Sequence, residues 1–166
     1  MLCSRASIEF GPRDTFLGNP VPRDQKLFSL DDKSYTYRFG GKTHKSVNLP
    51  ENLRDVIHRI LEFVRALGDD IKEPNAFVLN RYVSNQDSIS EHSDDEPEMD
   101  KKKPILSFSF GAARKFYIRN KETRERVDFV LELLIMLPGM QQTHTHCLPK
   151  QKEPTGLRFN ITMRYM

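Results

Sequence analysis

The sequence predicts an α+β domain in which one helix precedes an antiparallel β barrel or sandwich. Two observations lead to this fold class. In one segment, apolar residues recur at three- and four-residue spacing, which is typical of an amphipathic helix. After that segment, the chain consists of short strand-like runs separated by turn residues, which is typical of antiparallel sheets.

The length and composition fit one folded domain over residues 1–166. No run approaches the roughly 18 apolar residues that a membrane span needs. The segment at the start, MLCSRASIEF, lacks the apolar core of a secretory signal. We therefore expect an intracellular, monomeric protein without a membrane partner. The net charge of +3 permits a polyanionic partner but does not require one.

The elements are expected in a simple order along the chain. Residues 1–47 form an N-terminal extension, which is irregular over 11–26, where prolines gather, and has a strand at 34–39 followed by a turn at Gly40-Gly41. A helix is expected over 48–68 and packs against an outer face of the sheet. Residues 75–166 form the β core, with strands expected at 76–83, 105–110, 115–119, 126–136, 143–148 and 157–165.

His92 and Asp94 lie two residues apart in a polar, acidic stretch that follows an expected strand. In an extended segment these two side chains point to the same side, so both could bind one metal ion. His146, well downstream, is the best candidate for a third ligand. Two imidazoles and one carboxylate on a single face of the metal form the facial triad of non-haem Fe(II) oxygenases. Taken alone, the His-x-Asp pair is weak evidence, and a solvated acidic loop explains it better.

A second pattern lies near the end of the chain. Arg158, Asn160 and Arg164 are evenly spaced on an expected strand, so their side chains share one face, while the other face is apolar. Two guanidiniums inside a barrel are costly unless they meet anions. A dicarboxylate cosubstrate meets that need, because arginine binds carboxylates with two parallel hydrogen bonds. The alternative is an exposed edge strand with its basic side in water.

The stretch from Asn75 to the C-terminus resembles the catalytic core of AlkB-type nucleic-acid demethylases, which depend on Fe(II) and 2-oxoglutarate. The matching blocks occur in the order NAFVLNRY, ISEHSDDE, PILSFSFGAARKF, MLPGMQQTHTHCLP and LRFNITMR. The upstream segment VPRDQ…YTYRF resembles, less tightly, the substrate lid of the family's repair members. The resemblance implies a double-stranded β-helix (jelly-roll). It also implies Fe(II), 2-oxoglutarate and O₂ as cofactors, and methylated nucleic acid as the partner.

The resemblance assigns the metal ligands to His92, Asp94 and His146. His144 is the rival for the third position. The family ligand comes just before x-Leu-Pro, which selects His146, with His144 as a neighbour on the same strand face.

The resemblance also implies a binding site for 2-oxoglutarate. Arg158 and Arg164 are similar to the two arginines that bind its carboxylates. Hydrogen bonds to the same cosubstrate are expected from Asn80, Tyr82 and Asn160. Asn80 and Tyr82 are two residues apart on an expected strand and so share a face. An ordinary half-buried strand tyrosine is the alternative for Tyr82.

Substrate contacts are implied with less precision. Glu96 matches the acidic residue that lies near the target base, and the neighbouring Asp95 is easily mistaken for it. Tyr37 and Phe39 match the lid aromatics that stack on a flipped base. A register that uses Tyr35 and Tyr37 fits almost as well, and packing of these rings into the core is an equal alternative. Cations that could neutralise phosphates are Arg23, Lys42, Lys45 and the 101–103 run.

The function implied is the oxidative demethylation of N-methylated bases such as 1-methyladenine or 3-methylcytosine, with release of formaldehyde, succinate and CO₂. The chain is as compact as the small AlkB domains of plant-virus replication polyproteins, which favours RNA or single-stranded DNA as substrate. One alternative is a 2-oxoglutarate-dependent hydroxylase of a protein or small molecule. Another is a non-catalytic nucleic-acid-binding module, although such a module needs neither the triad nor the arginine pair.

Overall fold

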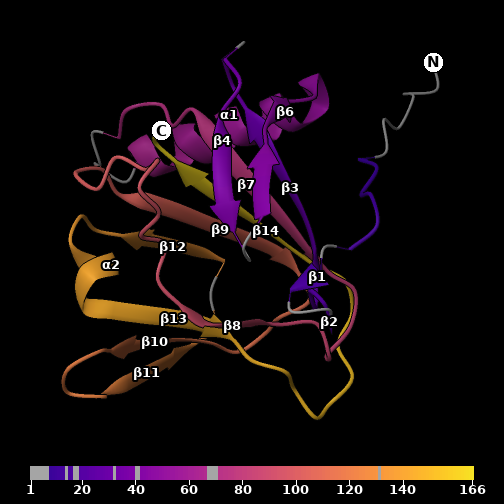
Figure 1. Cartoon of the computed structure of the whole chain (residues 1–166), viewed down its shortest axis with the longest axis vertical. Coiled ribbons are helices and arrows are strands. Elements are labelled where there is room, and N and C mark those ends of the chain that lie inside the picture. The colour runs from indigo at the N-terminus through magenta and orange to yellow at the C-terminus, as the bar shows by residue number, and fades with distance from the viewer. Residues whose placement is uncertain are drawn as a thin grey trace.

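The structure of this protein is a computed structural model that describes residues 8–13, 15–16, 19–31, 33–39, 42–66, 71–130 and 132–166. For residues 15, 16, 19, 20 and 39 it describes the backbone only. Within these residues, strands form two main sheets that lie one above the other, and a helix lies beyond the larger sheet (Figure 1).

The larger sheet has six strands in the order β12-β9-β14-β7-β3-β6. All of its pairs are antiparallel except β3 with β6, which is parallel. Along the chain its strands are β3 (Asp24–Ser29), β6 (Val47–Asn48), β7 (Ala76–Tyr82), β9 (Ile105–Gly111), β12 (Leu133–Met136) and β14 (Arg158–Arg164).

The smaller sheet has four antiparallel strands in the order β11-β10-β13-β8. Its strands are β8 (Ile89–His92), β10 (Phe116–Asn120), β11 (Arg126–Phe129) and β13 (His144–Leu148). Just before β13 lies the one-turn helix α2 (Met140–Thr143). Two further strand pairs stand apart from both sheets: β1 (Thr15–Phe16) with β2 (Asn19–Pro20), and β4 (Thr36–Phe39) with β5 (Lys42–Lys45).

Helix α1 (Glu51–Ala66) covers the outer face of the larger sheet. Its buried side chains recur every three or four residues and are Leu53, Ile57, Ile60, Leu61 and Val64. They form one core cluster with the outward-facing apolar residues of the sheet, which include Phe77, Leu79, Leu106, Ile161 and Met163. The outer face of the larger sheet is therefore occupied by the hydrophobic core, and the polar residues of these strands face the smaller sheet.

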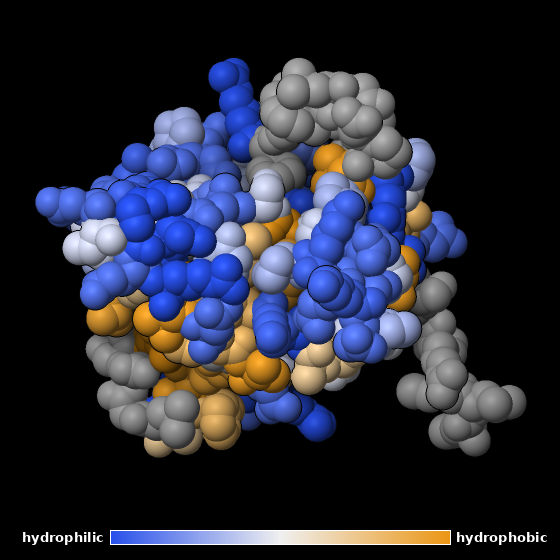
Figure 2. Space-filling model, turned by 90° about the horizontal axis from the view of Figure 1, so that it is seen from below, coloured by the Kyte–Doolittle hydropathy of each residue, from blue (hydrophilic) through white to orange (hydrophobic). Residues whose placement is uncertain are grey.

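Two facing, mainly antiparallel sheets with a helix ahead of the core strands confirm the expected double-stranded β-helix. No helix among the described residues is long and apolar enough to cross a membrane. Seen from below, most of the visible surface is hydrophilic, and hydrophobic side chains gather over one part of it (Figure 2).

Several element predictions need correction. Part of the stretch 11–26, predicted to be irregular, belongs to β3, whose buried residues place it inside the larger sheet beside β7. The strand predicted at 126–136 is two strands, because the chain leaves the smaller sheet after Phe129 and enters the larger one at Leu133. Thr143 lies in α2 and not in a strand.

The predicted helix is shorter than 48–68. It is described over Glu51–Ala66, and Val56, one of its apolar residues, is 39% exposed. Leu67, Gly68 and the predicted Gly40-Gly41 turn lie outside the described residues.

Candidate metal and cosubstrate site

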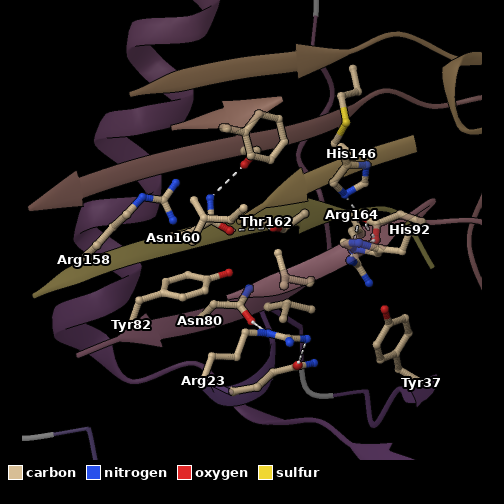
Figure 3. A pocket seen from close by; sticks show the side chains of 18 residues that line it. Arg23, Tyr37, Asn80, Tyr82, His92, His146, Arg158, Asn160, Thr162 and Arg164 are labelled. Atoms are coloured by element: carbon tan, nitrogen blue, oxygen red, sulfur yellow. Dashed lines mark hydrogen bonds and ion pairs between the residues drawn. The ribbon is translucent and has the colours of Figure 1, made fainter. Parts of the chain in front are cut away.

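A cavity lies between the two sheets. It is lined by inward-facing side chains of β3, β7, β9 and β14 on one side and of β8, β10 and β13 on the other. Arg158 and Tyr82 lie at one end and the histidines with Arg164 at the other (Figure 3). All residues predicted to bind metal or cosubstrate line this cavity: Asn80, Tyr82, His92, Asp94, His146, Arg158, Asn160 and Arg164.

His92, Asp94 and His146 form a compact group of candidate metal ligands. Their ligand atoms all lie within 4.8 Å of one another. The antiparallel register of β8 and β13 places His92 directly opposite His146, with the ring centroids 4.3 Å apart. Asp94 Oδ1 lies 3.4 Å from His92 Nε2 and 3.9 Å from His146 Nε2. Two imidazole nitrogens and one carboxylate meeting at one point fit the facial triad of Fe(II) oxygenases.

Neighbouring groups orient two of these side chains. Nδ1 of His92 lies 2.8 Å from the Ser90 carbonyl, and because a carbonyl only accepts, Nδ1 carries the proton. Nε2 of His92 then carries a lone pair on the side that faces the other two candidate ligands, which is the form that binds a metal ion. The backbone N–H of Asp94 donates to Oε1 of the buried Gln141 at 2.8 Å. The bond to Gln141 holds the ligand loop against α2.

The electrostatics of the group favour the protonation states that bind metal. Burial by itself would raise the pKa of Asp94, but the charge of Arg164 and the two imidazoles outweigh it and hold that pKa well below its usual range. Burial lowers the pKa of His146 to about 4. At neutral pH the pair is therefore a carboxylate and a neutral imidazole, the forms that coordinate a metal ion.

The structure brings His146 into this group and leaves His144 outside it. His144 Nδ1 lies 2.8 Å from Thr143 Oγ1. The groups of potential metal-binding side chains found among the described residues do not include His144.

The two predicted arginines are buried in the cavity wall. Arg164 bonds Asp94 Oδ2 through Nη2 at 2.7 Å, while its Nε and Nη1 are buried and have no hydrogen-bond partner among the described residues. Arg158 donates from Nη2 to Ser109 Oγ at 2.6 Å and lies over the Tyr82 ring, 5.3 Å from its centroid. Buried guanidinium nitrogens without partners need an anion, so a dicarboxylate such as 2-oxoglutarate fits these residues.

A row of polar residues crosses the larger sheet between the two arginines. Strand register places Gln25 opposite Asn80, Asn80 opposite Asn160, and Asn160 opposite Ser109. Asn160 donates from Nδ2 to Ser107 Oγ at 2.8 Å and to Ser109 Oγ at 3.1 Å. The cavity floor therefore carries hydrogen-bonding groups on four adjacent strands, although the outer face of the same strands is apolar.

Sequence reasoning missed part of this site. Arg23 was expected to be a phosphate-neutralising cation, but it is only 4% exposed and lines the cavity. Its position depends on β3, which the sequence did not reveal. The even spacing that identified Asn160 also applies to Thr162, and could have found it. The other missed residues are Gln25, Ser107, Ser109 and Gln141.

The predicted substrate residues are only partly brought together. Tyr37 lines the cavity, is 2% exposed and donates its hydroxyl to Glu96 Oε1 at 2.6 Å. Its ring lies 4.8 Å from the Arg164 guanidinium. Tyr35 instead bonds Asp31 and Asn75 and does not line the cavity. The side chain of Phe39 lies outside the described residues.

Comparison with known proteins gives the family. The family model described as "2OG-Fe(II) oxygenase superfamily" matches residues 1–164. "DNA oxidative demethylase ALKBH2" of Bos taurus is 36% identical over 155 residues, which are 87% of this chain and 53% of that protein. "Alpha-ketoglutarate-dependent dioxygenase alkB homolog 3" of Homo sapiens is 36% identical over 102 residues, 54% of this chain and 36% of that protein. The chain thus spans about half the length of the first of these relatives.

A solved structure agrees on the fold. The structure of OsALKBH1 superposes with a TM-score of 0.56 at 18% identity, covering 95% of this chain and 84% of that chain. The family match and the triad together confirm the predicted cofactors, Fe(II) and 2-oxoglutarate. The chain therefore belongs to the 2OG-Fe(II) oxygenase superfamily, as an AlkB-type member.

Proposed function

We propose that this protein removes methyl groups from N-methylated bases of nucleic acid by oxidation. The observation that carries the proposal is the triad of His92, Asp94 and His146 directly beside Arg164, whose buried nitrogens call for an anion. A metal group adjoining an anion pocket is what a reaction of Fe(II), 2-oxoglutarate and O₂ needs. A curated relative named as a DNA oxidative demethylase supports this activity, and another named as an alpha-ketoglutarate-dependent dioxygenase supports the use of this cosubstrate.

Each set of residues has a distinct role in this proposal. His92, Asp94 and His146 hold the iron. Arg158 and Arg164 bind the carboxylates of 2-oxoglutarate, with Asn80, Tyr82 and Asn160 as hydrogen-bonding neighbours. When bound, iron and cosubstrate supply the O₂-dependent hydroxylation of the N-methyl group, whose product releases formaldehyde, while 2-oxoglutarate becomes succinate and CO₂. The residues themselves bind, orient and shield the reactants.

The pair of Tyr37 and Glu96 is proposed to receive the base. Both belong to segments beside the cavity, and Tyr37 closes over Arg164. Burial raises the pKa of Glu96, so this carboxyl is able to act as a hydrogen-bond donor at a higher pH than an exposed glutamate. An aromatic ring with a hydrogen-bonding acid beside it suits a flipped, methylated base.

The β4–β5 hairpin supports a nucleic-acid substrate. It carries Tyr37 into the cavity, while Arg38, Lys42 and Lys45 are exposed on it. The sequence 33–45 contains no acidic residue. A phosphodiester backbone crossing this hairpin would release counterions on binding. We propose RNA or single-stranded DNA as the substrate, with 1-methyladenine and 3-methylcytosine as the target bases.

The test is anaerobic reconstitution with Fe(II) and 2-oxoglutarate, followed by admission of O₂ and mass spectrometry of oligonucleotides that contain 1-methyladenine. Single-stranded RNA and DNA of the same sequence are compared. We expect each methyl group to be lost with one equivalent each of succinate and formaldehyde. His146→Ala should abolish the reaction, and His144→Ala, on the same strand but outside the triad, should retain it.

Two outcomes would contradict the proposal. Succinate formation without loss of methyl groups from either oligonucleotide would move the reaction to a protein or small molecule. Nucleic-acid binding without any succinate from the iron-loaded protein would indicate a binding module.

A further inference from the structure

Arg23 lies inside the cosubstrate cavity, although neither the triad nor the arginine pair includes it. It is 4% exposed and stands just before β3. Its Nε donates to Asn80 Oδ1 at 2.9 Å, and its Nη2 donates to Gln25 Oε1 at 2.9 Å. Both partners line the cavity and belong to the polar row that crosses the sheet. Figure 3 shows the Arg23 guanidinium directly beneath the Asn80 amide.

This contact determines which way the Asn80 amide faces. A guanidinium has donors only, so the atom that it contacts must be the amide oxygen. The amide nitrogen of Asn80 is then turned away from Arg23 and toward β14 (Figure 3). Among the described residues no acceptor is recorded for that nitrogen.

The neighbouring amide behaves differently. Asn160 uses its nitrogen inside the protein, on Ser107 and Ser109, and its oxygen accepts from Thr162 Oγ1 at 3.1 Å. Of the two asparagines in the row, Asn80 is the one whose amide nitrogen is not used on a protein acceptor among the described residues, so its N–H groups remain for a ligand in the cavity. A cosubstrate with two carboxylates and a keto oxygen offers acceptors only, so it needs donors from the cavity wall.

We propose that Arg23 is a positioning residue for 2-oxoglutarate binding. Arg23 acts by holding the Asn80 amide in the orientation that directs its N–H groups toward the cosubstrate. The inference rests on the proposed role of this cavity in binding 2-oxoglutarate. Without Arg23 the amide is free to rotate, and its oxygen then faces an anionic ligand for part of the time. Arg23 therefore affects the affinity for 2-oxoglutarate without contacting the metal triad.

The test measures binding and not turnover. Calorimetry is used to titrate 2-oxoglutarate into protein loaded with Mn(II), for the wild type, Arg23→Met and Arg23→Lys. We expect binding about tenfold weaker in both variants, because one oriented hydrogen bond to a charged group is lost. Lysine keeps the charge but lacks the Nε donor, so wild-type affinity in Arg23→Lys would overturn the proposal.

Arg81→Met is the matched control. Arg81 is next to Asn80 on β7 but bonds Asp24 at 2.8 Å and does not line the cavity. We expect its affinity for 2-oxoglutarate to stay within about twofold of wild type. Affinity for Mn(II) without 2-oxoglutarate should be unchanged in the Arg23 variants, which shows that the folded metal site is retained. Should Arg23→Met fail to fold, Arg23→Lys gives the decision.

A double-mutant cycle with Asn80→Ala tests whether the effect of Arg23 on 2-oxoglutarate binding depends on Asn80. If Arg23 acts through Asn80, adding Arg23→Lys to Asn80→Ala should weaken binding by less than about twofold further. Full additivity of the two losses would show that Arg23 acts on its own and would refute the positioning role. The experiment contains no nucleic acid, so inactivity toward methylated oligonucleotides would refute the demethylase proposal while leaving this result intact.

Discussion

Arg164 Nη2 lies 2.7 Å from Asp94 Oδ2, so an arginine of the cosubstrate cavity is bonded directly to a member of the metal triad. Both side chains are almost fully buried, at 4% exposure each. The metal group and the anion pocket are therefore one electrostatic unit. Asp94 keeps its charge because Arg164 is present, and Arg164 still has two buried nitrogens for a further anion.

We predict that Arg164→Met destabilises the metal-free protein by about 3–5 kcal/mol, because it leaves Asp94 as a buried charge without a counterion. Arg158→Met should cost only about 1–3 kcal/mol, because its recorded hydrogen-bond partner is the neutral Ser109 hydroxyl. Mn(II) should restore stability to Arg164→Met, because the bound cation compensates the negative charge of Asp94. Urea unfolding with and without Mn(II) measures both effects, and equal losses in the two variants would argue against the shared unit.

Removal of a triad histidine should remove the metal. We expect His92→Ala and His146→Ala to weaken Mn(II) binding by more than about a hundredfold, since losing even an outer partner of a ligand costs about 10–100-fold. His144→Ala should bind as wild type does, because its side chain bonds Thr143 outside the group. Titration followed by electron paramagnetic resonance compares the three variants. Loss of binding in His144→Ala would instead support the alternative ligand.

Tyr37→Phe removes the hydroxyl that donates to Glu96. Glu96 Oε2 is a buried atom that already has no partner among the described residues, so the variant leaves this half-buried carboxyl poorly satisfied, at a cost of about 1–3 kcal/mol. We expect the KM for methylated oligonucleotide to rise about tenfold while the affinity for 2-oxoglutarate stays unchanged. Tyr35→Phe is the control for the other register, since Tyr35 bonds Asp31 and Asn75. A larger effect in Tyr35→Phe would contradict the assignment of Tyr37.

The exposed lysines of the β4–β5 hairpin should determine the salt dependence of nucleic-acid binding. Replacing Lys42 and Lys45 by Gln should reduce the slope of log affinity against log salt by about 0.7 for each phosphate contact to a single strand. Arg59→Gln, on the exposed side of α1 behind the larger sheet, should leave the slope unchanged. Fluorescence anisotropy at several salt concentrations provides the comparison. An unchanged slope in the lysine variant would show that the nucleic-acid backbone binds to a surface other than this hairpin.

Asp87 should make the stability of the fold sensitive to acid. Burial acts to raise its pKa, but the bonds from Arg13 and from the Val83 N–H outweigh burial and lower it. A carboxyl with a lowered pKa in the folded state contributes stability above its unfolded pKa and loses it as pH falls through the folded value. We expect Asp87→Asn to cost about 2 kcal/mol at pH 7.

The difference between Asp87→Asn and wild type should shrink as pH falls below about 4, where the unfolded carboxyl begins to take up its proton. Urea unfolding across this range measures it. A difference that is constant with pH would mean that the ion pair with Arg13 does not shift the titration of Asp87.

The sequence by itself determined the features that depend on local periodicity. The three- and four-residue spacing of Leu53, Ile57 and Ile60 identified α1, because one side of a helix repeats at that interval. Even spacing placed Arg158, Asn160 and Arg164 on one face of a strand, and the structure shows all three in the cavity. The close pair His92 and Asp94 was equally readable, since its geometry depends on one extended segment.

Only the tertiary structure decided the contacts between strands that are distant in the chain. The register of β8 and β13 brings His146 opposite His92, and no local pattern encodes that register. The same holds for Arg23. It reaches Asn80, 57 residues further along the chain, only because β3 pairs with β7. Strand pairing is fixed by burying one apolar face of the whole sheet, so the partners of an individual polar side chain emerge only when the sheet has assembled.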